Sequence, residues 1–239
     1  MTAKPLLYDG IHRYRVDTLY QIALDRVTDM QVHVPILREL ARGKRVLELG
    51  VRYGVSTAAF LAGRPSLMVS VDKEPFVYQE SYQVAAMEIG VLWRFLQQDS
   101  TQAELINSAQ AKLINHLSFA RTFDQLRAEW DVVFFDTTHT YDHLRRELNA
   151  YALGKDYPKM LIFHDTILFW DHDDAGWPSS DATGPTGPGI GRAVTEFRST
   201  YPEWRVTHER RYPTSRNFVP LTPDEHYALG CGLLVLERD

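Results

Sequence analysis

The sequence contains a single cysteine, Cys231, among its 239 residues. A lone cysteine excludes an intramolecular disulfide and any zinc site built from several thiolates, so we expect a buried small side chain. No apolar run approaches the roughly 20 residues that a membrane-spanning helix requires. The first residues, MTAKPLLYDGIHRYR, also lack the apolar core of a secretory signal. These absences predict a cytoplasmic protein.

An excess of positive charge is also missing. The chain has 26 Lys and Arg residues against 31 Asp and Glu residues, a net charge of −5 with histidine neutral. Such a chain has no global field that would attract nucleic acid or an anionic membrane, and we expect neither as a partner. Hydrophobic residues make up 44% of the sequence, which suits one globular domain over residues 1–239.

Short apolar runs alternate with segments of helical spacing. Five runs are typical of strands buried on both faces of a parallel sheet: residues 45–49, 67–71, 93–96, 132–135 and 160–163. Helical spacing precedes the first run and recurs at residues 56–61, 78–89, 143–153 and 192–199, with one or two further helices within 101–130. Residues 204–209 and 232–237 fit two final antiparallel strands. The pattern predicts an α/β fold, a doubly wound, mostly parallel, seven-stranded Rossmann-like sheet with helices on both faces.

Two segments lie outside this alternation. Residues 1–43 form a predicted helical lead-in. Its aromatic side chains (Tyr8, His12, Tyr14 and Tyr20) either cover a substrate pocket, pack on the core or contact another subunit. Residues 170–191 are rich in Gly, Pro, Ser and Asp and predict a long loop after the fifth strand. Loops of that length often act as active-site lids, and we expect this one to do so.

A glycine-bearing turn follows the first strand. Gly50 and Gly54 are spaced G-x-x-x-G, and glycine lets a backbone turn tightly and approach a ligand. The spacing is neither the G-x-G-x-x-G of dinucleotide sites nor a P-loop. Asp72 ends the second strand about 20 residues later, where a carboxylate can accept both hydroxyls of a ribose. The alternative is an ordinary turn in which Asp72 caps the next element.

Acidic and histidine residues follow the fourth and fifth strands. Asp136 ends the fourth strand, and His164 and Asp165 end the fifth. Adjacent parallel strands bring these side chains together, and such a set suits Mg²⁺ or Mn²⁺. His139 lies three residues beyond Asp136, at a place suited to a general base. The alternative for His139 is a cap on the following helix.

These features resemble the signature of class I S-adenosylmethionine-dependent methyltransferases. The resemblance implies that Gly50 and Gly54 shape the cofactor turn, that Asp72 binds ribose and that Asp99 lies beside adenine. It also includes Glu48, which opens the signature. Ser56 and Thr57 either cap their helix or meet the cofactor carboxylate.

The D-x-x-H-x-Y pattern from Asp136, followed by the pair at 164–165, resembles the metal-dependent O-methyltransferases of antibiotic and macrolide-sugar biosynthesis, the cephalosporin hydroxylase-like group. The resemblance covers roughly residues 29–199 and the closing strand. It implies metal ligands at Asp136, His164 and Asp165, a base at His139, and a small natural-product or sugar hydroxyl as acceptor. Two departures are His164, where that group carries an acid, and Thr137, where it often carries glycine.

The sequence therefore predicts an S-adenosylmethionine-dependent O-methyltransferase that uses a divalent metal and a histidine base. A catalytically inactive S-adenosylmethionine-binding protein is the alternative, because His164 removes one acid and could serve as a donor with no metal bound. A nicotinamide-dependent oxidoreductase is disfavoured by the glycine spacing. Homo-oligomerisation stays open, since no residue identifies an interface. Between residues 160 and 191 there are five aspartates and neither Lys nor Arg, so the acidity is concentrated where the predicted site lies.

Overall fold

The computed structural model describes residues 14–26, 28–102, 130–153, 158–171, 173–174, 187–210 and 231–239. The predicted helices within 101–130, most of the loop at 170–191, and Tyr8 and His12 lie outside the described residues. Within the described part, no helix combines the length and the hydrophobicity needed to cross a bilayer.

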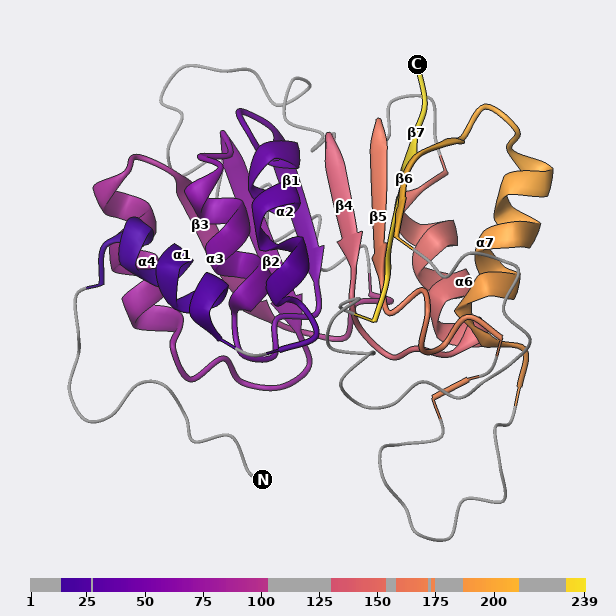
Figure 1. Ribbon diagram of the computed structural model, residues 1–239, viewed down its shortest axis with the longest axis horizontal. Helices are drawn as coiled ribbons and strands as arrows, with labels where there is room; N and C mark the ends of the chain where they lie inside the picture. The colour runs from indigo at the N-terminus through magenta and orange to yellow at the C-terminus, as the bar shows by residue number, and fades with distance from the viewer. Residues whose placement is uncertain are drawn as a thin grey trace, which may run out of the picture.

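The described strands form one seven-stranded sheet in the order β3-β2-β1-β4-β5-β7-β6 (Figure 1). The strands are β1 (Arg45–Leu49), β2 (Leu67–Asp72), β3 (Leu92–Gln97), β4 (Val132–Phe135), β5 (Met160–His164), β6 (Arg205–Arg210) and β7 (Leu233–Glu237). The first five are parallel, whereas β7 runs antiparallel to both β5 and β6. The predicted α/β sheet is confirmed, with strand ends shifted by no more than one residue.

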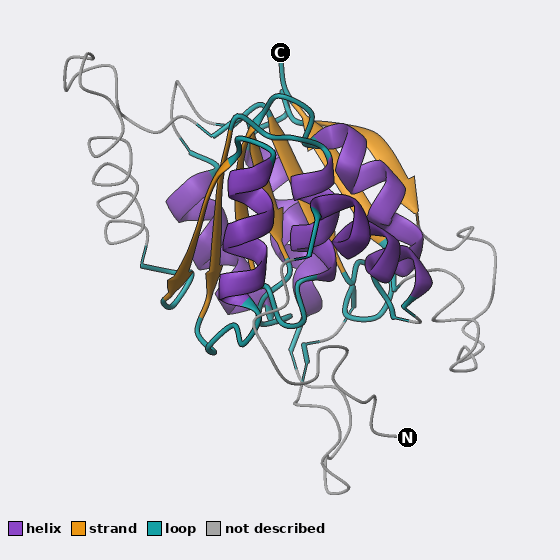
Figure 2. Cartoon of the chain, turned by 90° about the vertical axis from the view of Figure 1, so that its left-hand side faces the viewer, coloured by secondary structure: helices purple, strands orange, loops and turns teal. Residues whose placement is uncertain are grey.

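Helices cover both faces of the sheet, which makes three layers (Figure 2). One face carries α1 (Val16–Asp25), the 3₁₀ helix η1 (Gln31–His33), α2 (Val34–Leu40), α3 (Val55–Ala62) and α4 (Gln79–Glu88). The other face carries α6 (Tyr141–Tyr151) and α7 (Gly189–Thr200). Successive strand residues point to opposite faces, so Val46 joins the first core cluster and Leu47 the second.

The helices on the second face begin at polar caps close to the ends of the strands. The side chain of Thr140 accepts a hydrogen bond from the amide of His143 at the start of α6. The Asp173 carboxylate accepts hydrogen bonds from the amides of Tyr141 (2.7 Å) and Gly189 (3.0 Å), at the first residues of α6 and α7. Thr140 therefore holds the capping position that was the alternative role for His139, and Asp173 ties both helix starts together.

The sheet changes winding direction between β1 and β4, and Gly50 lies at this point. Its φ of 92° is in the left-handed region, and a Cβ there would lie 1.8 Å from the carbonyl oxygen of Asp136. The Asp136 amide also donates to the carbonyl of Leu49 (2.8 Å). Residues after β1 and β4 therefore touch through their backbones, at the edge where ligands bind in open α/β sheets.

Replacing Gly50 by alanine should lower the free energy of unfolding by about 3 kcal/mol, because it adds a steric clash with backbone to left-handed strain. Gly43 is a matched control, because its φ is 66° and a Cβ there would meet nothing within 4 Å. Gly43→Ala should cost only about 1 kcal/mol. Urea unfolding of both variants measures the difference, and equal losses would contradict the close approach.

Candidate functional site

The first part of the site is the connection from β1 to α3, held by a buried carboxylate. Glu48 is 0% exposed and accepts hydrogen bonds from the hydroxyls of Ser56 (2.6 Å) and Thr57 (2.8 Å). Burial raises the pKa of Glu48 to about 7, although hydrogen bonds from Ser56, Ser70 and Thr57 act in the opposite direction. These contacts fasten α3 to β1. Direct contact of Glu48, Ser56 or Thr57 with a cofactor stays a prediction.

Asp72, at the end of β2, holds the glycine turn through backbone amides. Its Oδ2 accepts from Val51 (2.8 Å) and Arg52 (3.0 Å), and its Oδ1 accepts from Glu74 (2.9 Å). A carboxylate has about four acceptor positions, so about one remains for a ribose hydroxyl. The structure therefore gives Asp72 a role in holding the glycine turn that differs from the predicted cap on the next element, and its ribose role stays a prediction.

The turn itself is packed tightly at Gly54, which has φ 78° and precedes α3. A Cβ there would lie 2.7 Å from the ring of Phe76, and the Tyr82 hydroxyl donates to the Gly54 carbonyl (3.0 Å). Tyr53, in the same turn, is 46% exposed and lies beneath the guanidinium groups of Arg26 (4.4 Å) and Arg52 (5.1 Å). The turn thus exposes the side chains of Arg52 and Tyr53.

Asp99 follows β3 and is exposed. Its Oδ1 accepts hydrogen bonds from the hydroxyl (2.6 Å) and the amide (2.8 Å) of Thr101, and these bonds lower the pKa of Asp99. The next residue, Ser100, is 3.1 Å from the ring of His143. Asp99 is accessible at the carboxyl edge of the sheet, and its predicted place beside adenine stays a prediction.

The second part of the site is a cluster of two carboxylates and two imidazoles. His139 Nε2 lies 2.9 Å from Asp165 Oδ2 and 3.4 Å from Asp136 Oδ1. His164 Nδ1 lies 3.2 Å from Asp136 Oδ1 and 3.4 Å from Asp165 Oδ2. The ring of His139 stacks on Phe169 at 4.8 Å. The structure therefore brings together all four residues that the sequence placed after β4 and β5.

The charges in this cluster shift one another's titration. Burial alone would raise the pKa of Asp136, but the charge of His164 and hydrogen bonds from both histidines lower it to about 2. Burial likewise opposes ionisation of Asp165, and His164 and His139 lower its pKa. In return, the carboxylates raise the pKa of His139 and His164 well above the usual value, against the effect of burial. Two negative and two positive groups compensate one another in a buried place.

The cluster also fits a divalent cation. Asp136, His139 and Asp165 each offer a ligand atom, and these atoms lie within 4.8 Å of one another. Asp165 Oδ1 is buried and has no hydrogen-bond partner among the described residues. Side-chain exposure separates the two histidines, at 18% for His139 and 1% for His164. His139 can therefore meet a small molecule, whereas His164 is enclosed.

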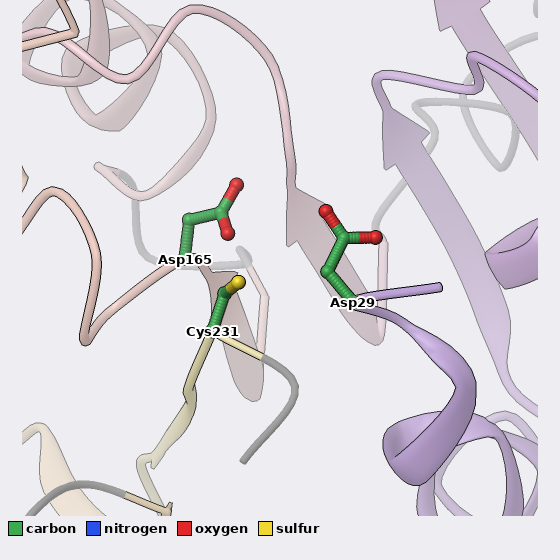
Figure 3. A group of neighbouring side chains, drawn as sticks. All are labelled: Asp29, Asp165 and Cys231. Atoms are coloured by element: carbon green, nitrogen blue, oxygen red, sulfur yellow. The ribbon is translucent and has the colours of Figure 1, made fainter. Parts of the chain in front are cut away.

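Two residues near the cluster, Asp29 and Cys231, were missed as functional candidates in the sequence, and a third, Asp174, was noted only as part of the acidic stretch. Asp174 Oδ2 lies 3.7 Å from His139 Nδ1. Asp29 and Cys231 flank Asp165 from the other side, and Figure 3 shows their side chains directed toward it. No motif connects these positions, since they come from distant segments. The only signal in the sequence was the density of aspartate at 171–174. Of the three residues near the cluster, it includes only Asp174.

No protein-family model matches the sequence, and no curated protein matches it significantly. Similar solved structures exist. An O-methyltransferase family protein from Burkholderia thailandensis shares 17% identity with a TM-score of 0.50, over 94% of this chain and 59% of that one. An O-methyltransferase from Bacillus cereus, in complex with S-adenosylhomocysteine, shares 14% identity with a TM-score of 0.49, over 98% of this chain and 93% of that one.

The MycE methyltransferase of the mycinamycin biosynthetic pathway shares 17% identity with a TM-score of 0.48, over 96% of this chain and 54% of that one. Its structure contains Mg, S-adenosylhomocysteine and mycinamycin VI. This chain thus spans about half of MycE. The fold of the chain is that of class I S-adenosylmethionine-dependent methyltransferases. At these identities the likeness extends to the fold alone, and the chemistry has to follow from the residues of the site.

The buried carboxyl of Glu48 gives a prediction for the pH dependence of stability. Its pKa is about 7 in the folded protein against 4.5 ordinarily, so folding favours the protonated form. This contribution to stability is present below pH 4.5 and is lost as the pH rises through 7. The free energy of unfolding of the wild type, minus that of Glu48→Gln, should therefore fall by about 3 kcal/mol over this range.

Urea unfolding at a series of pH values measures this difference. Glu39→Gln is the control, since Glu39 is exposed on α2. The free energy of unfolding of the wild type minus that of Glu39→Gln should not change with pH over this range. A flat difference for Glu48→Gln as well would contradict the raised pKa.

Proposed function

We propose that the chain is an S-adenosylmethionine-dependent O-methyltransferase that methylates a hydroxyl of a small molecule, with a divalent cation and a histidine base. A sugar or natural-product acceptor follows from the resemblance in the sequence. The observation that carries the proposal is the position of the Asp136–His139–Asp165 group. Asp136 touches Gly50 through the backbone, so the carboxylates that would hold a cation adjoin the turn that would hold the cofactor.

The chemistry requires an acceptor oxygen in line with the methyl carbon of a sulfonium. An alcohol is a poor nucleophile while it keeps its proton, and a bound divalent cation would lower the pKa of that hydroxyl and hold it in position. Asp136 and Asp165 supply the hard oxygen ligands that such a cation prefers. His139, the more exposed imidazole, would be suited to take the hydroxyl proton at Nε2 once a bound cation displaces the proton that Asp136 and Asp165 hold on the ring, which stacks on Phe169.

His164 occupies a different position in this scheme. Its ring is enclosed, and its Nδ1 reaches the same two carboxylates as His139. As a nitrogen ligand it would shift the preference of the site from Mg²⁺ toward Mn²⁺ or another transition metal. As a protonated partner it would orient Asp136 and Asp165 instead.

A second candidate function is S-adenosylmethionine binding without catalysis. The mutual compensation of two carboxylates and two imidazoles favours it, because the cluster can be neutral with no cation bound. The two candidates differ in turnover and not in cofactor binding. A nicotinamide oxidoreductase is disfavoured by the glycine spacing of the turn, in which Arg52 stands where a dinucleotide site needs a small residue.

Asp72→Asn should weaken binding of S-adenosylhomocysteine at least tenfold, because it removes a carboxylate that both holds the turn and would accept a ribose hydroxyl. Titration calorimetry measures the affinity, with NAD as a ligand expected not to bind. Glu74→Gln, two residues away and exposed, is the matched control and should change affinity less than twofold. Unchanged affinity in Asp72→Asn, or tight binding of NAD, would overturn the cofactor assignment.

Asp136→Asn and His139→Gln should each lower kcat/KM at least a hundredfold while changing affinity for S-adenosylhomocysteine less than threefold. Turnover is followed as S-adenosylhomocysteine formed with a panel of sugar and glycoside hydroxyl acceptors. Asp142→Asn and His208→Gln are controls outside the cluster and should retain activity. Full activity in both cluster variants would contradict the proposed base and ligand. Cofactor binding without turnover on any acceptor would favour the second candidate.

A further inference from the structure

A second group of metal-binding side chains lies beside the first. Asp29, Asp165 and Cys231 each offer a ligand atom, and these atoms lie within 4.8 Å of one another. Figure 3 shows the two carboxylates and the sulfur directed toward a common point. Asp29 comes from the turn before η1, Asp165 follows β5, and Cys231 precedes β7. Three separate segments therefore converge here.

The carboxylate of Asp165 indicates that this convergence serves a ligand. Asp165 is only 5% exposed, and its Oδ1 has no hydrogen-bond partner in the described part of the chain. A buried carboxylate oxygen without a partner is costly, and proteins ordinarily satisfy such atoms. A cation bound at this place would satisfy it.

The backbone supports the same interpretation. Asp165 and Cys231 have φ values of 57° and 54°, in the left-handed region that residues with side chains rarely adopt. Gly232, next to Cys231, has φ 99°, and a Cβ there would lie 2.6 Å from the backbone nitrogen of Ile167. Both potential ligands thus have a left-handed backbone conformation, and Cys231 precedes a tightly packed glycine.

We propose that Asp29, Asp165 and Cys231 bind a divalent transition metal of the zinc class, beside the cation group of the methyl-transfer site. A thiolate is a soft ligand that favours Zn²⁺ or Co²⁺ over Mg²⁺, and two carboxylates complete a mixed set. The thiol proton passes to solvent when the metal binds. Because a carboxylate has two oxygens, Asp165 can serve both groups. Arg52, 3.8 Å from Asp29 Oδ2, is the competing partner that the metal would displace.

This site shares Asp165 with the cation group of the proposed methyl transfer, and Cys231 makes it measurable on its own. Since the chain has one cysteine, a sulfur-to-metal charge-transfer band can come only from Cys231. Adding Co²⁺ to the metal-free, reduced full chain should give such a band in the near ultraviolet, which rises to a plateau as Co²⁺ is added. Excess Mg²⁺ should leave the band unchanged, and Zn²⁺ should remove it.

Variants identify the ligands. Cys231→Ser should abolish the band, and Asp29→Asn should weaken Co²⁺ binding at least tenfold. Asp136→Asn, which alters only the first group, should retain the band. Circular dichroism verifies folding of each variant.

X-ray absorption of the zinc-loaded wild type gives a measurement that needs no variant, and one sulfur at about 2.3 Å is expected. Absence of the charge-transfer band and of that sulfur would overturn the proposal. If folded Asp29→Asn showed the band and bound Co²⁺ as tightly as the wild type, Asp29 would not be a ligand, and the site as stated would be overturned. Neither result would affect binding of S-adenosylhomocysteine, so failure here is distinguishable from failure of the proposed function.

Discussion

Gly50 and Asp136 meet backbone to backbone where the winding of the sheet reverses. The missing side chain at Gly50 is what permits the contact, and it brings the turn after β1 against the end of β4. The rest of the site follows from it. Glu48 binds the first residues of α3, Asp72 binds the backbone of the turn from the end of β2, and the contact with Gly50 places Asp136 beside the turn. A ligand seated on the turn would have the charged cluster as its neighbour.

The cluster also accounts for part of the excess of aspartate after β5. Asp165 lies inside the cluster, Asp174 borders it, and Asp173 accepts hydrogen bonds at the starts of two helices, so three of the aspartates after β5 have distinct contacts. Buried carboxylates need compensating charge, and His139 and His164 provide it within hydrogen-bonding distance. A bound cation would enter competition with protons on these imidazoles. The affinity of the site for metal should therefore depend on the protonation states of His139 and His164.

The strands and the edge-of-sheet residues could be predicted because their signals are local. Buried parallel strands are short apolar runs, and parallel strands necessarily bring the residues after them to one edge, so Asp136 and His164 were expected to meet. The roles of Glu48 and Asp72 were harder to predict, because a carboxylate that holds backbone or hydroxyl groups looks the same in sequence as one that binds a ligand. The contribution of Asp29 and Cys231 could not be predicted, since it depends on the packing of segments far apart in the chain.

The antiparallel course of β7 has a consequence for how the protein is made. Because β7 runs against its neighbours, its beginning and not its end lies at the carboxyl edge, and so Cys231 reaches Asp165. The surroundings of Asp165 therefore combine residues after β5 with a partner from before η1 and another from just before the last strand. During synthesis, β5 can pair with β4 early, but it can pair with β7 only after β7 has been synthesised. Folding of this edge then waits for the final strand, as expected for a chain whose contacts span most of its length.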